Sequence, residues 1–211
     1  MSLPPSNLRV EQDGRVRRLT LAAPARRNVL DAALAVNLLN ELRDAQADPN
    51  TGAVLIDGEG PVFCGGMDWT EPVAEEIFAF GRQAVKPIVL AMQGVAISAG
   101  LALIANAHVA VAAQGSSFGL TDIRESRCHL GILKAVAAAI GDRRTRELSL
   151  TGRVFTAPEA LAWGLVHALT PPFELDDRAS AIATALANAD PGTVRTILEH
   201  FYREPFIETR V

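Results

Sequence analysis

Cysteine is scarce in this chain of 211 residues, because only Cys64 and Cys128 are present. Neither cysteine belongs to a disulfide pattern of the kind found in secreted proteins. We therefore predict reduced thiols and a cytoplasmic location rather than a disulfide-stabilised fold. The sequence also lacks an apolar run of membrane-spanning length, and its polar, proline-rich start shows no apolar leader. These absences argue against a membrane protein, and no membrane partner is expected.

Basic charge is not in excess either, since 20 Lys and Arg face 24 Asp and Glu and the formal net charge is −4. The chain therefore carries no overall electrostatic footprint for nucleic acid, and none is expected as a partner. The histidines are scattered at positions 108, 129, 167 and 200, without the spacing of a metal site. No bound metal is predicted.

What the sequence does contain is an alternation of strand-like and helix-like segments after a hairpin signal at Asp13-Gly14. Alternation of this kind predicts an α/β fold with a largely parallel sheet. The predicted strands are 8–10, 16–21, 53–57, 87–92, 109–113 and 166–169, and the predicted helices are 32–47, 73–83, 99–107, 133–140, 143–150, 157–163, 175–188 and 192–202. Pro171-Pro172 is the best boundary, dividing an α/β core at 1–170 from a short helical C-terminal segment at 171–211.

Two small-residue turns, each leaving an apolar strand, carry the first functional signal. The first is Phe-Cys-Gly-Gly-Met-Asp at 63–68, and the second is Gly-Val-Ala-Ile-Ser-Ala-Gly at 94–100. Turns of this kind can bring bare backbone N–H groups to one point, where they hold an oxygen that becomes negative during a reaction. The alternative is that the glycines only serve tight packing between strand and helix.

Together with other stretches, these turns resemble the crotonase (enoyl-CoA hydratase/isomerase) superfamily in the family's own order, from about residue 16 to 170. The matching stretches are PARRNVLD (24–31), FCGGMD (63–68), KPIVLAMQGVA (86–96), SAG (98–100), SFGLTDIR (117–124), ELSLTGR (147–153) and ALAWGLV (160–166). The resemblance implies a spiral of ββα units, a homotrimer or a dimer of trimers, and an acyl-CoA thioester as substrate. It implies no prosthetic group, because coenzyme A enters only as part of the substrate.

Mapped position by position, the resemblance implies that the backbone amides of Gly65 and Ala99 hold the thioester oxygen. A thioester enolate needs two donors aimed at one oxygen, and the positive end of a helix opening at Ala99 would add to their effect. Cys64 adjoins the first turn without an obvious base, so a buried structural role is expected for its side chain.

The acid and base of the family's hydratases are where the match fails. One of their two glutamates corresponds to Ala102, which cannot carry a proton, and the other corresponds to Asp122, which is shorter by one methylene. Asp122 is the candidate proton carrier, and Glu125 is a second candidate if its loop turns inward. A helix cap or loop anchor is the alternative for Asp122, and a surface ion pair is the alternative for Glu125. His129 lies in the same loop and is expected to be a surface residue.

Coenzyme A contacts are implied for the loop at Arg26, Arg27 and Asn28, because this loop lies near the adenosine-phosphate part of the ligand in the family. Guanidinium groups bind phosphate bidentately, which supports the assignment, although an exposed basic loop is the alternative. Near the first turn, Met67 is expected to form a pocket wall and Asp68 to serve as a turn or cap residue.

Two hypotheses follow from this pattern. The first is an enoyl-CoA hydratase/isomerase-like enzyme whose single carboxylate favours moving a double bond over efficient hydration. The second is a crotonase-fold protein that binds acyl-CoA or assembles with partners but has lost catalysis. The alanine at 102 and the shorter aspartate favour it. So do two departures from the family, namely a shorter segment between Asp68 and Lys86, which forms part of the acyl pocket's lid in relatives, and a C-terminal helical part that ends early.

Overall fold

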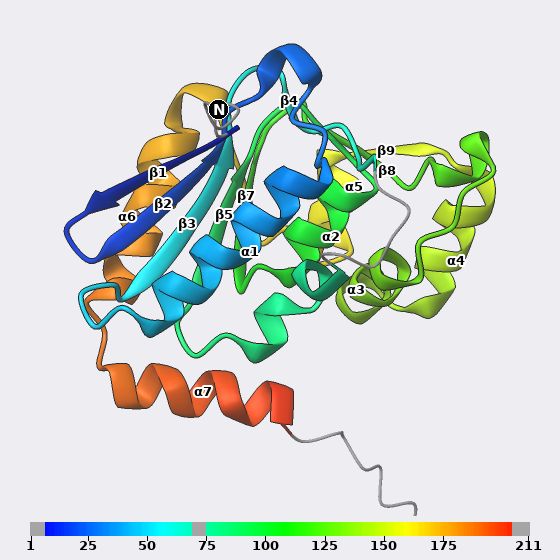
Figure 1. Cartoon of the computed structure of the whole chain (residues 1–211). Helices are drawn as coiled ribbons and strands as arrows, with labels where there is room; N and C mark the ends of the chain where they lie inside the picture. Colours follow the sequence, from blue (N-terminus) through cyan, green and yellow to red (C-terminus); the bar gives the residue numbers. More distant parts are fainter. Residues whose placement is uncertain (1–6, 69–74, 204–211) are drawn as a thin grey trace, which may run out of the picture.

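The computed structural model describes residues 7–68 and 75–203, and within these residues ten strands form two sheets (Figure 1). The larger sheet has the order β1-β2-β3-β5-β7-β10. Its strands are β1 Leu8–Asp13, β2 Val16–Leu21, β3 Ala53–Gly58, β5 Ile88–Met92, β7 Val109–Ala113 and β10 Ala168–Thr170. Within this sheet, the β1–β2 hairpin is the one antiparallel pair of the described strands, so the predicted largely parallel sheet is confirmed.

The smaller sheet consists of three-residue strands in the order β4-β6-β8-β9. These strands are β4 Val62–Cys64, β6 Val95–Ile97, β8 Ser117–Gly119 and β9 Val154–Thr156. Since β4, β6 and β8 directly follow β3, β5 and β7 in the chain, each passage through the large sheet continues into the small one. This repeated pairing of strands, with helices or 3-10 turns between successive pairs, confirms the predicted crotonase-like α/β spiral of ββα units.

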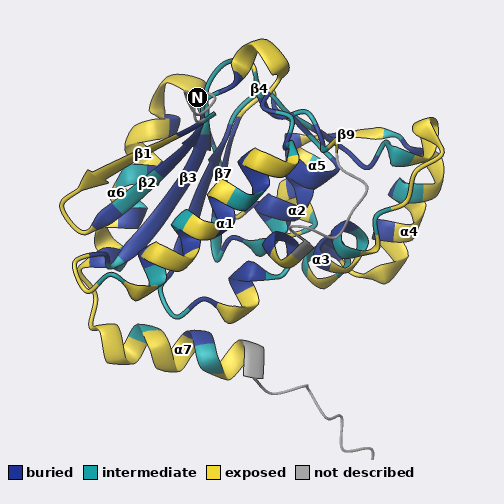
Figure 2. Ribbon diagram, in the orientation of Figure 1, coloured by how far each residue is buried: buried dark blue, intermediate teal, exposed yellow. Residues whose placement is uncertain are grey.

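Helices cover both faces of the large sheet (Figures 1 and 2). Helix α1 (Ala32–Ala47) begins at the predicted cap, where Asp31 Oδ1 accepts a 2.7 Å hydrogen bond from Leu34 N–H. It shares one core with the buried helix α2 (Ala99–Asn106). On the other face, α6 (Leu175–Ala187) buries a stripe of residues spaced by four against the strands, namely Leu175, Ala179, Ala183 and Ala187. Although this helix belongs to the C-terminal segment at 171–211, it covers one face of the large sheet.

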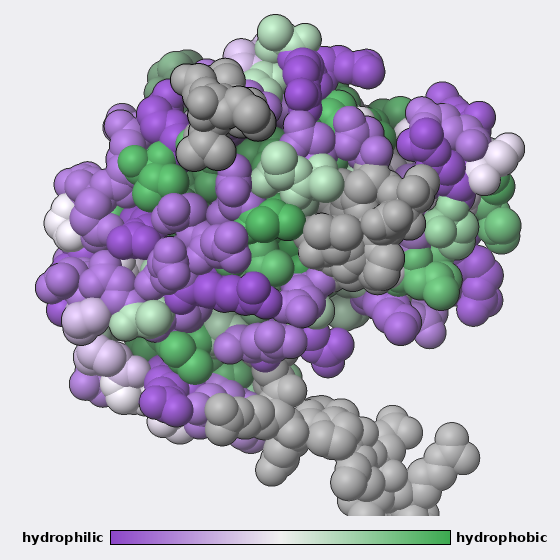
Figure 3. Space-filling view, viewed as in Figure 1, coloured by the Kyte–Doolittle hydropathy of each residue, from purple (hydrophilic) through white to green (hydrophobic). Residues whose placement is uncertain are grey.

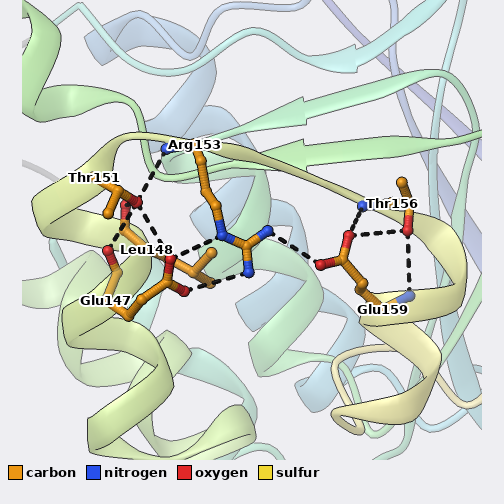
Figure 4. Close-up of polar contacts among 6 residues, drawn as sticks. All are labelled: Glu147, Leu148, Thr151, Arg153, Thr156 and Glu159. Carbon is orange, nitrogen blue, oxygen red and sulfur yellow. Dashed lines mark hydrogen bonds and ion pairs between the residues drawn. The ribbon is translucent and has the colours of Figure 1, made fainter.

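The remaining helices are α3 (Leu130–Ile140), α4 (Asp142–Thr151), α5 (Ala157–Ala162) and α7 (Pro191–Arg203), and the short 3-10 turns are η1 (Pro24–Arg26), η4 (Asp122–Glu125) and η5 (Pro172–Glu174). Arg153 joins α4 to α5, because its guanidinium donates to Glu147 and to Glu159 (Figure 4). Glu159 in turn completes a capping box with Thr156 at the start of α5. The helix start predicted at Thr156 is thus confirmed.

One predicted helix is wrong in its form. The segment predicted as a helix over 73–83 contains two 3-10 turns, η2 (Glu75–Phe78) and η3 (Phe80–Gln83), and its first two residues lie outside the described ranges. Ala79 interrupts the segment with φ −127°, which is not helical. The chain also packs the bare Cα of Gly81 against the Asn106 carbonyl, where a Cβ would lie 1.9 Å from the oxygen. Close tertiary packing therefore determines the backbone here.

His108 is a buried histidine that links this segment to the large sheet. Its Nδ1 accepts a 2.8 Å hydrogen bond from Ile88 N–H, so the proton of the neutral ring is placed on Nε2, which lies 3.2 Å from the Gly81 carbonyl oxygen. Burial lowers the pKa of His108 to about 4. The folded protein therefore holds this imidazole neutral at pH values where an unfolded chain would protonate it.

We expect His108 to make folding stability depend on pH between about 6.5 and about 4. The contribution of the neutral ring is complete above pH 6.5 and is lost as the pH falls toward 4, because the unfolded state binds the proton first. Two and a half pH units correspond to about 3 kcal/mol. Urea unfolding at pH 7 and pH 4.5 measures this loss in the wild type and in His108→Gln. An equal loss in both proteins would contradict the assignment.

Candidate functional site

The first small-residue turn is held in place by the loop that precedes α1. Gly65 N–H donates a 2.8 Å hydrogen bond to the carbonyl oxygen of Arg27, and Leu30 N–H donates to the carbonyl oxygen of Gly66 at 2.9 Å. The Gly65 amide is thus already bonded within the protein. The prediction that this amide is an oxyanion donor is wrong, because the turn directs it toward the loop rather than toward open space.

The amide of Met67 is placed differently. Leu30 and Met67 form a parallel bridge whose hydrogen bonds are made by the flanking Gly66 carbonyl and Asp68 N–H. In a parallel bridge the central residue's own N–H points away from its partner strand. Within the described residues, Met67 N–H donates no hydrogen bond. Two positions beyond the predicted residue, the turn therefore offers an unpartnered donor.

The second turn presents the N-terminus of α2. Leu101 and Ala102 both donate to the Ser98 carbonyl, whereas the amides of Ala99 and Gly100 have no acceptor among the described residues. Ser98 precedes the helix without a side-chain cap to it. The predicted donor Ala99 is fully buried and is the first residue of α2. Its N–H therefore lies at the positive end of the helix dipole, and both would stabilise a negative charge placed there.

Gly100 keeps the two turns close together. A Cβ on Gly100 would lie 3.0 Å from both the Cβ and the carbonyl oxygen of Cys64, in the strand that leads into the first turn. The absence of a side chain at this position therefore lets the start of α2 pack directly on β4. A side chain at Gly100 would therefore push β4, which leads into the turn of Met67, away from the start of α2.

For the acyl-CoA substrate that the resemblance implies, we expect Gly100→Ala to lower turnover by about 100-fold, since a displacement near 1 Å has that effect in active sites. Gly192→Ala, in the first turn of α7, is the matched control, because its nearest neighbour would be 3.5 Å away. Turnover and thermal unfolding are measured for both variants. Unchanged turnover in a folded Gly100→Ala protein would contradict this role.

Asp122 opens the turn η4 and is half-buried. Its Oδ2 accepts a hydrogen bond from the hydroxyl of Ser98, the residue immediately before the Ala99 amide. The structure thus brings the predicted carboxylate to the second turn. Sequence reasoning missed Ser98, because a serine before a helix normally indicates a cap, and here the hydroxyl bonds to a distant residue instead.

A cavity of about 590 Å³ adjoins Asp122, between η4 and the helices α3 and α4. Its walls are mainly apolar and include Leu120, Ile123 and Leu133, with His129 also on the lining. In Figure 3, apolar surface interrupts the polar surface on the lobe formed by these helices. A carboxylate at the edge of an apolar cavity is typical of a site for a small ligand. A larger cavity of about 840 Å³ lies between α7 and the helices α2 and α3, and Asp122 is not on its lining.

The other candidate acid–base positions differ from Asp122. Ala102 is fully buried in α2, so the second carboxylate of the family's hydratases is replaced by a packed methyl group. Glu125 is exposed and forms a 3.3 Å ion pair with Arg127, which is the surface alternative left open by the sequence. Asp122 is therefore the better placed of the two carboxylates predicted from the sequence.

The loop predicted to bind coenzyme A separates into two kinds of residue. Asn28 is fully buried, accepting from Ala23 N–H and donating to the carbonyls of Glu59 and Val62. Its side chain has no group left for a ligand, so its role is to fix the loop and the predicted ligand contact is wrong. Arg27 is exposed, and Arg26 is exposed and paired with Asp31.

Met67 and Asp68 follow the expectations in part. Met67 is half-buried and packs against the main core, as a pocket wall would, although its backbone amide is the more informative group. Asp68 is exposed, and its N–H donates to the Leu30 carbonyl at 3.1 Å, as expected for a turn residue.

Cys64 is a structural residue. It is fully buried, its thiol lies 3.5 Å from the Gly66 carbonyl, and burial raises its pKa to about 11.

Among the described residues, no group of three or more His, Cys, Asp and Glu side chains is placed to hold a metal ion. The helices of the same residues include none with the length and apolar character needed to cross a bilayer.

A spiral of ββα units with two amide-presenting turns defines the crotonase class of α/β protein. A family model described as enoyl-CoA hydratase/isomerase matches residues 11–206, so the chain belongs to the enoyl-CoA hydratase/isomerase family, which is a family of enzymes. Mevalonyl-coenzyme A hydratase of Aspergillus fumigatus is 29% identical over 195 residues, covering 86% of this chain and 72% of that protein.

Solved structures support the same assignment. An enoyl-CoA hydratase from Mycobacterium avium superposes with a TM-score of 0.81 at 30% identity, covering 93% of this chain and 87% of the other. Human enoyl-CoA hydratase domain-containing protein 3 superposes with a TM-score of 0.88 at 26% identity, covering 93% and 83%.

Proposed function

We propose that this enzyme binds an acyl-CoA thioester, removes a proton from its α-carbon and stabilises the resulting enolate. The N–H groups of Met67 and Ala99 would receive the thioester oxygen, and Asp122 would carry the proton. The observation that supports this most directly is the combination of two unpartnered amides with a carboxylate bonded to the residue before one of them.

The chemistry of this arrangement favours shifting a double bond within the acyl chain. Asp122 takes the α-proton, the negative charge moves to the thioester oxygen, and the same carboxylate returns the proton at the far end of the allyl system. Hydration additionally requires a base for water and an acid for carbon. The methyl group of Ala102 supplies neither, so slow hydration is proposed.

The apolar cavity beside Asp122 would receive the acyl chain, and the exposed Arg26 and Arg27 would lie near the phosphates of coenzyme A. The homotrimer or dimer of trimers predicted from the sequence remains part of the proposal. It is supported by large apolar side chains left exposed outside that cavity, namely Val154, Leu161 and Phe173. A cytoplasmic location also remains part of the proposal.

The experiment that tests the function uses butyryl-CoA in heavy water, with mass spectrometry to detect deuterium at the α-carbon. Binding is measured in parallel by isothermal titration calorimetry. A 3-enoyl-CoA and a 2-enoyl-CoA of equal length then compare isomerisation with hydration, and faster isomerisation is expected. Protein that neither binds butyryl-CoA nor exchanges its α-proton would refute the enzymatic function.

The second hypothesis, a binding protein without catalysis, is favoured by the loss of the carboxylate at position 102. It predicts binding of butyryl-CoA without enzyme-dependent exchange. The same pair of measurements therefore separates the two hypotheses.

A further inference from the structure

Ser98 has an unusual backbone conformation for a residue with a side chain. Its φ is 47° and its ψ is −100°, a combination that glycine adopts easily and other residues adopt at a cost. The position is also buried, with 3% of the residue exposed, so the side chain gains no solvent contact. Within the described residues, three other non-glycine residues have a positive φ, which are Arg27, Asn28 and Ser126.

The strained position is fixed by its neighbours rather than by the serine itself. Ser98 N–H donates a 2.9 Å hydrogen bond to the Gly119 carbonyl in β8, and the Ser98 carbonyl accepts from Leu101 and Ala102 in α2. The backbone therefore passes from β6 into α2 through one tightly held residue. Glycine would satisfy all of these backbone bonds, so none of them explains a hydroxymethyl group at this position.

The hydroxyl makes one hydrogen bond, and it goes to Asp122 Oδ2. This bond links two segments 24 residues apart in the chain, the turn that presents the Ala99 amide and the turn η4 that carries the carboxylate. Apart from this bond, the Asp122 carboxylate has no other hydrogen bond or ion pair within the described residues. Its second oxygen, Oδ1, is left available.

We propose that Ser98 is a positioning residue, which holds the Asp122 carboxylate at a set place relative to the Ala99 amide. An aspartate has one methylene less than a glutamate, and a carboxylate attached to a 3-10 turn is free to rotate away from the substrate. The Ser98 hydroxyl fixes Oδ2 and thereby directs Oδ1 to the α-carbon. One residue thus sets the geometry of both the donor of the oxyanion hole and the proton carrier.

This inference rests on the proposed function, and Ser98→Gly tests it. Glycine adopts the observed φ and ψ without strain, so the variant is expected to fold at least as well as the wild type. Loss of the hydroxyl is expected to lower kcat for α-proton exchange of butyryl-CoA by about 10- to 100-fold, with KM unchanged. Ser116→Ala is the control, because Ser116 is equally buried and its hydroxyl has no hydrogen-bond partner.

A double-mutant cycle with Asp122→Asn then separates positioning from a general structural effect. If Ser98 acts through the carboxylate, Ser98→Gly has an effect of less than about 2-fold once Asp122 is replaced. Equal losses in both backgrounds, or full kcat in Ser98→Gly, would overturn the inference while leaving the proposed function intact. A wild-type protein without α-proton exchange would overturn both.

Discussion

Replacing Asp122 with asparagine is expected to lower the rate of α-proton exchange by about 10²- to 10⁴-fold, the usual contribution of a general acid–base group. Asparagine has nearly the same shape and can still accept a hydrogen bond from Ser98. The variant therefore removes the basic oxygen without opening a hole. The dissociation constant of butyryl-CoA is expected to remain unchanged, since the carboxylate acts on the transition state.

The matched control for Asp122→Asn is Glu125→Gln, three residues further along the same turn. Glu125 is exposed and paired with Arg127 at 3.3 Å, so its neutralisation is expected to leave exchange unchanged. A residual exchange rate in Asp122→Asn equal to that of the wild type would assign the proton to another group. His129, on the lining of the same cavity, would then be the next residue to replace.

Replacing Gly94 with alanine is expected to have the largest effect on folding. Gly94 lies between β5 and β6 with φ +70°, and a Cβ there would lie 1.8 Å from the Pro61 carbonyl oxygen. The left-handed conformation costs about 1–2 kcal/mol for alanine. The forced separation of two backbone segments adds about 1–3 kcal/mol. A combined loss of about 2–5 kcal/mol is a large part of the stability of a domain of this size.

Gly14→Ala provides the comparison for Gly94→Ala. Gly14 also has a positive φ, +53°, but no atom lies within 4 Å of its added Cβ. Its substitution is therefore expected to cost only the conformational part, about 1–2 kcal/mol. Urea unfolding measures both free energies. Equal losses at the two positions would show that the contact with Pro61 has no energetic weight.

The sequence predicted the elements whose signals are local. Asp31 caps α1 as expected, and the hairpin, the parallel strands of the large sheet and the helix after Thr156 were all predicted from cap, turn and apolar patterns. The strands β4, β6, β8 and β9 were not predicted, because three residues carry too little periodicity. Their existence depends on pairing with partners distant in the chain.

For the site, the sequence identified the turns but not the direction of each group within them. Gly65 and Met67 lie in the same turn. The hydrogen bond to the Arg27 carbonyl engages the Gly65 amide, and the bridge to Leu30 leaves the Met67 amide free. Likewise, Asn28 lies in a basic loop, and its burial follows from tertiary contacts with the carbonyls of Glu59 and Val62. Residue type indicates the chemistry that a turn can perform, whereas hydrogen-bond partners decide which residue performs it.

The contrast between the two cysteines has a practical consequence. Cys64 is buried in the core, and burial raises the pKa of its thiol to about 11. Cys128 is exposed and is one of the residues that line the cavity beside Asp122. A thiol-directed fluorophore will therefore attach to the folded wild-type chain at a single place, without removal of any native cysteine. That place is next to the cavity, so the attached dye would report ligand entry as a change in emission.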